Sequence, residues 1–280
     1  MKAVIIAAGY GTRFLPATKT IPKEMFPLID RPAIDFIVQE CIDSGIEEIL
    51  IISSRRKKVL EDYFDREIEL ENVFQAGNSP ELEKINPPAA RFTFIRQQRM
   101  RGTGDALLAC ENFAAGEPLV VAYPDDLVFG PLPLSRQLIE CRSSDRDCVL
   151  AVMRVPGEDT HRYGIVESGP DGQVRRIVEK PAPGTATCNL ALIGRYIITP
   201  EIFPLLREEQ KKNPEGEYYQ IDPMNRLAER GVVRAVEFKG QRLDTGAPEG
   251  YLRAVLEYAL MREDLRPTLK QAVEALSRRL

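Results

Sequence analysis

Side chains that bind soft metals are scarce in this sequence, and long apolar segments are missing from it. His161 is the only histidine, and the five cysteines are scattered without a Cys-x-x-Cys pair. Metal sites built from thiolates or imidazoles are therefore not expected, and the cysteines are interpreted as reduced structural thiols. No apolar run approaches the length of a membrane span, and Met1 leads directly into a strand-like segment. We expect a cytoplasmic protein with no membrane partner.

An excess of positive charge is also missing. The formal net charge of the 280 residues is -4, so the chain has no overall basic field, and no nucleic-acid partner is expected. Any polyanionic ligand must instead be held by local cations. The hydrophobic content of 44% and the charged content of 29% are typical of a globular protein, in one large domain or two closely joined ones.

A glycine-rich loop follows the first predicted strand. Residues 3–7 form a short run rich in Val and Ile, which predicts a buried parallel strand. Gly9 and Gly11 come next, where glycines let the backbone approach a bulky ligand and free N–H groups suit an anion. Three cations follow in a segment that prolines keep from becoming a helix: Arg13, Lys19 and Lys23. Together these features predict a polyphosphate site.

Two better-known glycine loops do not fit this segment. A P-loop requires Lys and then Ser or Thr after its second glycine, whereas Gly11 is followed by Thr12 and Arg13. A dinucleotide-binding fingerprint requires a third small residue where this chain has Phe14, and a helix where it has prolines. Both alternatives are therefore excluded.

Strand-like and helix-like segments alternate in the first half of the chain. Buried strands are predicted at residues 49–52, 92–95 and 119–122, with helices at 34–42, at 55–64 and from 105 onward. This alternation implies right-handed crossovers and a parallel sheet. Ligands of such sheets bind beyond the carboxyl ends of the strands, so we expect Gly9, Gln97 and Asp125 to share one crevice. The basic run at residues 56–58 is expected to be a solvated helix face.

The character of the chain changes after about Pro131. Strand-like segments occur at residues 150–155, 164–167, 174–179, 190–198 and 232–238, and helices are predicted at 200–206, at 223–229 and from 248 onward, the last at 269–280. The expected fold class is α/β, with a Rossmann-like mixed, mostly parallel sheet flanked by helices. A smaller β-rich portion and C-terminal helices complete it.

The string AAGYGTRFLPATKTIPKEMFPLIDRP at residues 7–32 contains the pattern G-x-G-T-R-x-x-P followed by P-K-E-M. This pattern resembles the signature of the sugar-phosphate nucleotidylyltransferases, and the longer string looks most like the members that transfer uridylyl groups. The resemblance covers residues 2 to about 262. It implies transfer of a uridylyl group from UTP to glucose 1-phosphate, with release of pyrophosphate. A thymidylyltransferase, another enzyme of this class, or a catalytically silent nucleotide-sensing subunit are the alternatives.

The resemblance also implies how the chain is divided. Residues 1–262 would form the nucleotidyltransferase domain, in which 1–130 bind the nucleotide and 131–247 bind the sugar phosphate. Residues 263–280 would form a C-terminal helical tail. A homo-oligomer is expected, although the amphipathic last helix could be either a subunit contact or cover for the core.

On the nucleotide side, the resemblance assigns a binding role to a set of loop residues: Ala8, Gly9, Gly11, Thr12, Gln97 and Gly102. Gln97 would read the uracil, because a buried amide left unmatched by the wrong base costs about 1–3 kcal/mol. Arg13 and Lys23 would act in catalysis by holding the β and γ phosphates. The sequence departs from the family pattern at Thr103 and Asp105, where Leu and His are usual. It departs again at residues 217–222, which the resemblance places near the sugar side.

Two carboxylates, Asp125 and Asp126, close the fourth predicted strand, and hard oxygen ligands next to a polyphosphate site suit Mg²⁺. The resemblance assigns the metal to Asp125 together with Asp244 of a later D-T-G segment. Asp126 is interpreted as a helix cap or a solvated charge and is left out of the metal site.

On the acceptor side, the resemblance assigns sugar contacts to Glu179, to the backbone at Gly164 and to Asn189. Lys180 would neutralise the sugar phosphate and so take part in catalysis. Glu179 and Lys180 are neighbours on a strand and would normally point to opposite faces, but the proline at 181 permits a break at the strand end. His161 is expected to be a hydrogen-bonded surface residue and not a catalyst.

Overall fold

A nine-stranded mixed sheet runs through the molecule, which the computed structural model describes from residue 1 to residue 279. Its first half contains four parallel strands: β1 (Lys2–Ile6), β4 (Glu48–Ser53), β5 (Arg91–Arg96) and β6 (Leu119–Ala122). These are the four strands that the apolar runs predict. The last four residues of β1 are buried, as expected of a parallel strand that is covered on both faces.

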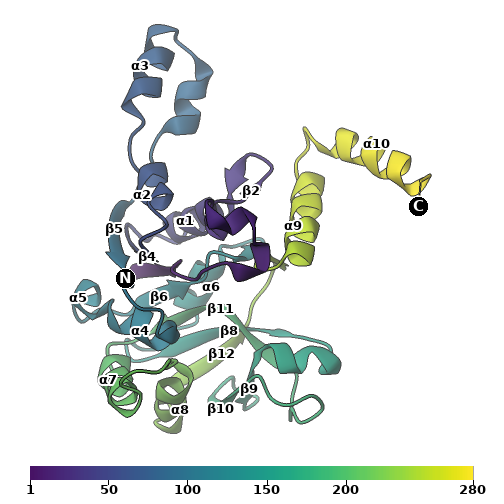
Figure 1. The fold of residues 1–280 in the computed structure, drawn as a ribbon. Coiled ribbons are helices and arrows are strands. Elements are labelled where there is room, and N and C mark those ends of the chain that lie inside the picture. Colours follow the sequence, from purple (N-terminus) through teal and green to yellow (C-terminus); the bar gives the residue numbers. More distant parts are fainter. Residues whose placement is uncertain (280) are drawn as a thin grey trace.

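The second half continues the same sheet with mainly antiparallel pairs. Its strands are β8 (Cys148–Arg154), β9 (Gly164–Ser168), β10 (Val174–Glu179), β11 (Leu190–Ile198) and β12 (Val233–Glu237). β11 pairs antiparallel with β6 of the first half and with β8 of the second, so the two halves share one sheet (Figure 1). The predicted α/β fold with a mixed sheet and a β-rich second portion is confirmed.

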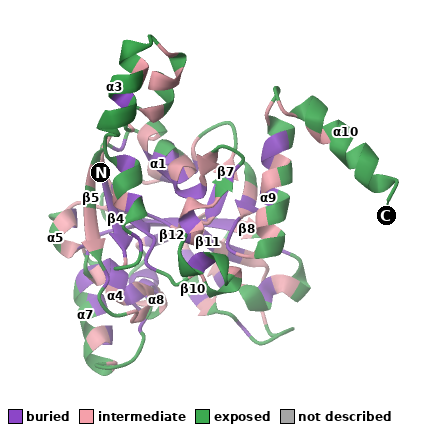
Figure 2. Ribbon diagram, turned by 45° about the horizontal axis from the view of Figure 1, so that its top comes forward, coloured by how far each residue is buried: buried purple, intermediate pink, exposed green. Residues whose placement is uncertain are grey.

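Helices cover both faces of the sheet, because side chains along the central strands alternate between two hydrophobic cores. On one face, Val4 and Ile6 belong to the core covered by α4 (Gly102–Leu108), α5 (Glu111–Ala114), α7 (Ile202–Lys212) and α8 (Ile221–Glu229). On the other face, Ala3 and Ile5 belong to the core covered by α1 (Ala33–Asp43), α2 (Val59–Phe64), α6 (Leu134–Glu140) and α9 (Pro248–Met261). Figure 2 shows the buried sheet between these partly buried helices.

Two short ribbons lie beside the main sheet. β7 (Asp126–Phe129) pairs antiparallel with β13 (Gln241–Asp244), and β2 (Pro27–Leu28) pairs with β3 (Arg31–Pro32). The sequence did not predict β7, because Pro124 and the two following carboxylates were interpreted as the end of a strand. The first ribbon positions the site, since it places Asp244 directly opposite Asp126.

A buried ion pair between Arg195 and Glu40 links strand β11 to helix α1. The fully buried Arg195 of β11 donates from Nε and Nη2 to the two carboxylate oxygens of Glu40, at 2.8 and 2.9 Å. Its Nη2 also donates to the backbone oxygen of Asp126 at 3.3 Å. The backbone N–H of Ser135 on α6 donates to Glu40 at 2.9 Å. Because both charges have several partners, the cost of burying them is offset.

Two helices extend away from the body of the molecule. α3 (Ile68–Ala76) and α10 (Arg266–Ser277) project from it in Figure 1, and α10 has no buried residue. The last helix was predicted at 269–280. It begins and ends three residues earlier, and Leu280 lies outside the described residues. Within residues 1–279, no helix is both long enough and apolar enough to cross a membrane.

Candidate active site

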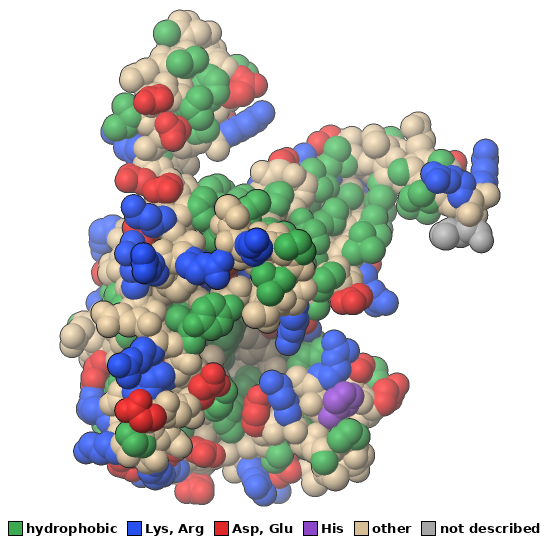
Figure 3. Space-filling view, in the orientation of Figure 1, with side chains coloured by type: hydrophobic (Ala, Val, Ile, Leu, Met, Phe, Trp, Pro, Cys, Tyr) green, Lys and Arg blue, Asp and Glu red, His purple; other side chains and the backbone are tan. Residues whose placement is uncertain are grey.

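The loops after three parallel strands line one cleft at the carboxyl edge of the sheet. Gly9 follows β1, Gln97 follows β5 and Asp125 follows β6, and all three line a cleft of about 280 Å³. Figure 3 shows the molecule hollowed between its upper and lower parts. The expectation that these residues share one crevice is confirmed. Tyr123 and Tyr219 also line it. Sequence reasoning missed them, because a single aromatic residue gives no signal that distinguishes a binding site from a core.

The loop between β1 and α1 turns back on itself at Gly11. This residue has a left-handed backbone (φ 68°), and a Cβ there would lie 3.1 Å from Cγ2 of Thr18. The hydroxyl of Thr18 donates to the backbone oxygen of Gly11 at 2.8 Å. In place of an α-helix, the loop contains three short 3-10 turns: Thr12–Phe14, Ala17–Lys19 and Lys23–Met25. The turn at Gly11 brings Lys23 back to the cleft.

Lys57 supports this loop from behind, and the prediction that it belongs to a solvated face is wrong. Its side chain is buried, and Nζ donates to Glu24 Oε1 at 2.6 Å and to the backbone oxygen of Ala7 at 2.5 Å. Burial lowers the pKa of Lys57, and the Glu24 carboxylate opposes that shift in part. The neighbouring Arg56 and Lys58 are exposed, as predicted. Lys57 differs from them because its Nζ bonds the backbone oxygen of Ala7, which follows β1, and the carboxylate of Glu24.

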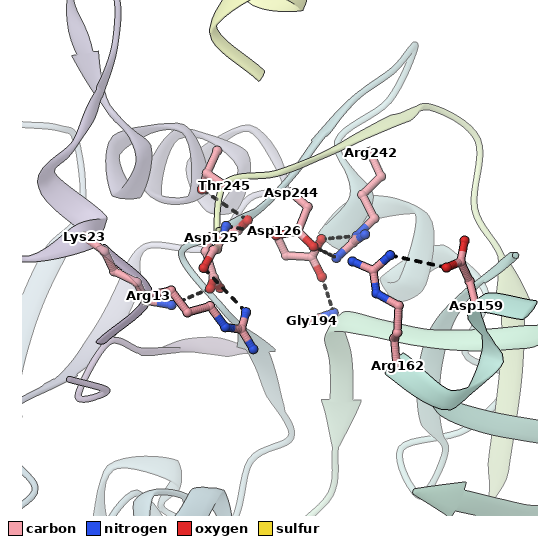
Figure 4. A network of polar contacts seen from close by, with 11 residues as sticks. Arg13, Lys23, Asp125, Asp126, Asp159, Arg162, Gly194, Arg242, Asp244 and Thr245 are labelled. Atoms are coloured by element: carbon pink, nitrogen blue, oxygen red, sulfur yellow. Dashed lines mark hydrogen bonds and ion pairs between the residues drawn. The ribbon is translucent and has the colours of Figure 1, made fainter. Parts of the chain in front are cut away.

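Lys23 and Asp125 form an ion pair inside the cleft (Figure 4). Burial by itself would lower the pKa of Lys23, but the carboxylate of Asp125 raises it. Burial would likewise raise the pKa of Asp125, and the ammonium of Lys23 lowers it instead. Both groups therefore stay charged. Arg13 lies beside this ion pair in Figure 4, and its Nη1 is 3.5 Å from the backbone oxygen of Gly246.

Asp126 points the other way, and its interpretation as a helix cap or a solvated charge is wrong. It begins β7, is buried, and accepts a hydrogen bond from the backbone N–H of Gly194 at 2.6 Å. Its other oxygen pairs with Nε of Arg242, whose Nη2 lies 3.0 Å from Asp244. Burial raises the pKa of Asp126, although Arg242 opposes the shift. The Asp126 carboxylate therefore links β7 to Arg242 of β13, whereas Asp125 lines the cleft.

Asp125 and Asp244 come together around Gly246. The backbone N–H of Thr245 donates to the backbone oxygen of Asp125 at 2.8 Å. A Cβ on Gly246 would lie 2.8 Å from Asp125 Oδ2 and 3.1 Å from Asp244 Oδ1, so these oxygens are within about 6 Å of one another. Glycine is needed here because any side chain would enter the space between the two carboxylates.

This donor set fits Mg²⁺ and no softer metal. Within residues 1–279, no group of three or more His, Cys, Asp or Glu side chains is arranged to hold a metal ion. Mg²⁺ is commonly held by only one or two protein carboxylates and takes its other ligands from substrate phosphates and water. Asp125 and Asp244 supply that number of oxygen-bearing groups.

The predicted nucleotide-binding residues divide into two groups. Ala8, Gly9, Gln97 and Gly102 all line the cleft, and Nε2 of Gln97 donates to the backbone oxygen of Gly102 at 3.2 Å. Gly11 and Thr12 belong to the adjoining turn and do not line the cleft. The base-reading and phosphate-binding roles assigned to these residues stay predictions.

On the predicted sugar side, Gly164 and Glu179 are brought together by the pairing of β9 with β10. A Cβ on Gly164 would lie 3.0 Å from Oε2 of Glu179. β10 ends at Glu179, and Lys180 takes a left-handed backbone (φ 42°), which turns the chain at the position where a break was expected. The side chain of Asn189 is used differently, because Nδ2 donates to the backbone oxygen of Val155 at 3.1 Å.

His161 stays on the surface. Its Nδ1 lies 2.7 Å from the backbone oxygen of Glu158, and the residue is exposed. The expectation of a hydrogen-bonded surface histidine is confirmed.

The family model for nucleotidyl transferases matches residues 2–260. The chain belongs to the nucleotidyl transferase family. This nucleotidyl transferase is 42% identical to a UTP–glucose-1-phosphate uridylyltransferase of Bacillus subtilis (strain 168), over 98% of this chain and 96% of the relative. The family resemblance inferred from residues 7–32 is thus confirmed.

Solved structures agree with this nucleotidyl transferase over nearly their whole length. A UTP-bound UGPase from Acinetobacter baumannii superposes with a TM-score of 0.86 at 34% identity, covering 97% of this chain and 98% of the other. A UDP-glucose pyrophosphorylase complexed with UDP-glucose gives a TM-score of 0.81 at 37% identity, covering 93% and 99%.

Proposed function

We propose that this nucleotidyl transferase moves a uridylyl group from UTP to glucose 1-phosphate, giving UDP-glucose and pyrophosphate. The observation that carries the proposal is the meeting of Lys23, Asp125 and Gln97 in one cleft. A pyrimidine nucleoside triphosphate requires a cation for its phosphates, a carboxylate for its metal ion and an amide for the edge of its base. Lys23, Asp125 and Gln97 would supply these three groups. The names of the relatives, and the UTP and UDP-glucose bound to the solved structures, support the same substrates.

The chemistry needs no activated side-chain nucleophile. A phosphate oxygen of glucose 1-phosphate attacks the α-phosphorus of UTP in line, and the bond from that phosphorus to the bridging oxygen of pyrophosphate breaks. The main obstacle is the repulsion between two polyanions, so catalysis consists mostly of positioning and charge neutralisation. Well-oriented reactants can lower the barrier by roughly 7–11 kcal/mol.

The cations of the chain have separate tasks in this proposal. Arg13 and Lys23 bind the β and γ phosphates and stabilise the departing pyrophosphate. Lys180 binds the attacking phosphate, while Glu179 and the backbone at Gly164 hold sugar hydroxyls, with Asn189 beside them. Asp125 and Asp244 would hold Mg²⁺, which supplies positive charge next to the reacting phosphates when bound.

A grid of nucleoside triphosphates against sugar 1-phosphates tests the function. Pyrophosphate release is measured for UTP, dTTP, CTP, ATP and GTP with each sugar phosphate, with Mg²⁺ and after chelation. UTP with glucose 1-phosphate and Mg²⁺ is expected to give the highest kcat/KM. A higher value for dTTP would instead identify a thymidylyltransferase. No pyrophosphate release with any pair would indicate a catalytically silent subunit. The presence of Arg13, Lys23, Asp125 and Asp244 argues against that outcome.

A cytoplasmic location and a homo-oligomer complete the proposal. The reaction consumes a nucleoside triphosphate, which is a cytoplasmic metabolite. The surface of the last two helices includes exposed apolar side chains that a second copy would cover: Leu252, Leu256, Leu260, Val273 and Leu276. Sedimentation of the purified chain tests this part, and a single species with the mass of one chain would contradict it.

A further inference from the structure

The two segments that depart from the family pattern are in contact with each other. Thr103 hydrogen-bonds through its hydroxyl to the side chain of Gln220. The hydroxyl of Tyr218 donates to Oδ1 of Asp105 at 3.2 Å. More than 100 residues of sequence separate the partners in each pair. The unusual residues therefore belong to one cluster, and Glu217 and Tyr219 of the segment expected near the sugar side line the same cleft as Gln97.

The backbone of this cluster is packed closely enough to require glycine. The N–H of Gly104 donates to the backbone oxygen of Tyr218 at 3.1 Å, and the N–H of Tyr218 donates to the backbone oxygen of Arg101 at 3.0 Å. A Cβ on Gly102 would lie only 2.4 Å from the backbone oxygen of Tyr218. These contacts fix the phenol of Tyr218 against the loop that carries Asp105.

Asp105 is also bonded to Gln97, and this bond determines which way the Gln97 amide faces. Nε2 of Gln97 donates to Asp105 Oδ2 at 2.9 Å and to the backbone oxygen of Gly102 at 3.2 Å. A carboxylate and a carbonyl can only accept, so both require the NH₂ end of the amide. Rotating the amide would place Oε1 against two acceptors. Both N–H groups are used, and Oε1 is the atom left for a ligand.

Tyr218 donates to the oxygen of Asp105 that Gln97 does not use. Burial, and next to it the charge of Asp105, raise the pKa of Tyr218 to about 12. The phenol therefore stays protonated at neutral pH and donates to the carboxylate. Asp105 therefore accepts from Tyr218 at Oδ1 and from Gln97 at Oδ2.

We propose that Asp105 is a positioning residue that fixes the Gln97 amide with Oε1 toward the cleft and so selects a base that carries a hydrogen on N3. This inference rests on the proposed function. Uracil offers an N3–H donor to Oε1, whereas the N3 of neutral cytosine is an acceptor and would face another acceptor. The selection acts against CTP and in favour of UTP, and it leaves uracil and thymine equivalent at this atom.

The test compares kcat/KM for UTP and CTP, at saturating glucose 1-phosphate, in the full-length wild type and in Asp105→Asn. The asparagine has the same shape but can donate to Oε1, so the amide loses its preferred direction. The CTP-to-UTP ratio is expected to rise by about 10- to 100-fold, the range expected when a hydrogen bond to a charged group is lost. KM for glucose 1-phosphate is expected to stay unchanged.

Tyr218→Phe is the matched control, because it removes a hydrogen bond from the same cluster but keeps the carboxylate. It should lower the melting temperature and leave the ratio within about threefold of wild type. If Asp105→Asn does not fold, Asp105→Ala is measured in its place, with the same expected direction. An unchanged ratio in a folded Asp105 variant overturns the inference and makes the cluster purely structural. A wild type that fails to use UTP overturns the proposed function instead.

Discussion

The residues proposed to bind the nucleotide, Lys23, Asp125 and Gln97, are mostly buried and hydrogen-bonded. Glu179 and Lys180, which are proposed to bind the sugar phosphate, are largely exposed. The side chains of Lys23 and Asp125 are 19% and 25% exposed and form an ion pair. Those of Lys180 and Glu179 are 65% and 48% exposed, and their charged atoms are 3.7 Å apart. The proposed nucleotide site is therefore preorganised, while the side chains of the proposed sugar site keep conformational freedom that a bound ligand must remove.

The largest expected effect concerns the buried pair behind the nucleotide loop. Lys57→Met leaves Glu24 as an unpaired buried carboxylate and should lower the free energy of unfolding by about 3–5 kcal/mol. KM for UTP should rise as well, because Lys57 ties that loop to the end of β1. Chemical denaturation and steady-state kinetics measure the two effects.

Lys58→Met is the control for that experiment. It removes the same charge from the adjacent residue, which is exposed, and should change the unfolding free energy by less than about 0.5 kcal/mol. Equal losses in the two variants would mean that the Lys57 pair does not support the nucleotide side.

The second expected effect distinguishes the role of Asp125 from that of its neighbour Asp126. Asp125→Asn should lower kcat by about 10²–10³-fold, because a neutral amide is a poor ligand for the Mg²⁺ that would neutralise the reacting phosphates. Asp126→Asn should act mainly on stability. Asparagine has one acceptor oxygen for the two donors Gly194 and Arg242, so stability should fall by about 1–3 kcal/mol while kcat changes less. Near-normal turnover of Asp125→Asn with Mg²⁺ would remove this residue from the metal site.

The third effect is smaller and confined to the sugar side. Lys180→Ala should raise KM for glucose 1-phosphate by about 10-fold and leave KM for UTP unchanged, because it removes one cation that is exposed before the ligand binds. Arg176→Ala, which removes an exposed cation from the preceding strand β10, serves as the control and should change neither value. Equal effects of the two substitutions would contradict the role assigned to Lys180.

The contrast between the two sides also shows what the sequence could predict. The strands of the sheet were predictable because alternating and continuous apolar runs are local signals, and the positions of Gly9, Gln97 and Asp125 followed from strand ends. The four residues of β7 were missed, since they become a strand only by pairing with β13, which lies more than 100 residues away.

Burial and orientation of single charged side chains were the hardest features to predict. Lys57 belongs to a basic run that is typical of an exposed helix face. It can be buried because its ammonium group pairs with Glu24, which lies 33 positions earlier in the sequence. Asp125 and Asp126 are identical neighbours, and the chain direction at the start of β7 alone decides which one faces the cleft. The bond between Asp105 and Tyr218 likewise depends on tertiary contact.

A crystal structure of the protein with UTP and Mg²⁺ tests the central claim most directly. The account predicts one metal ion bound by the carboxylates of Asp125 and Asp244, at about 2.0–2.1 Å from each. Lys23 is expected to have left Asp125 for the β and γ phosphates. A structure in which UTP occupies the cleft while Asp125 remains paired with Lys23, or in which the ion binds away from both carboxylates, would contradict it.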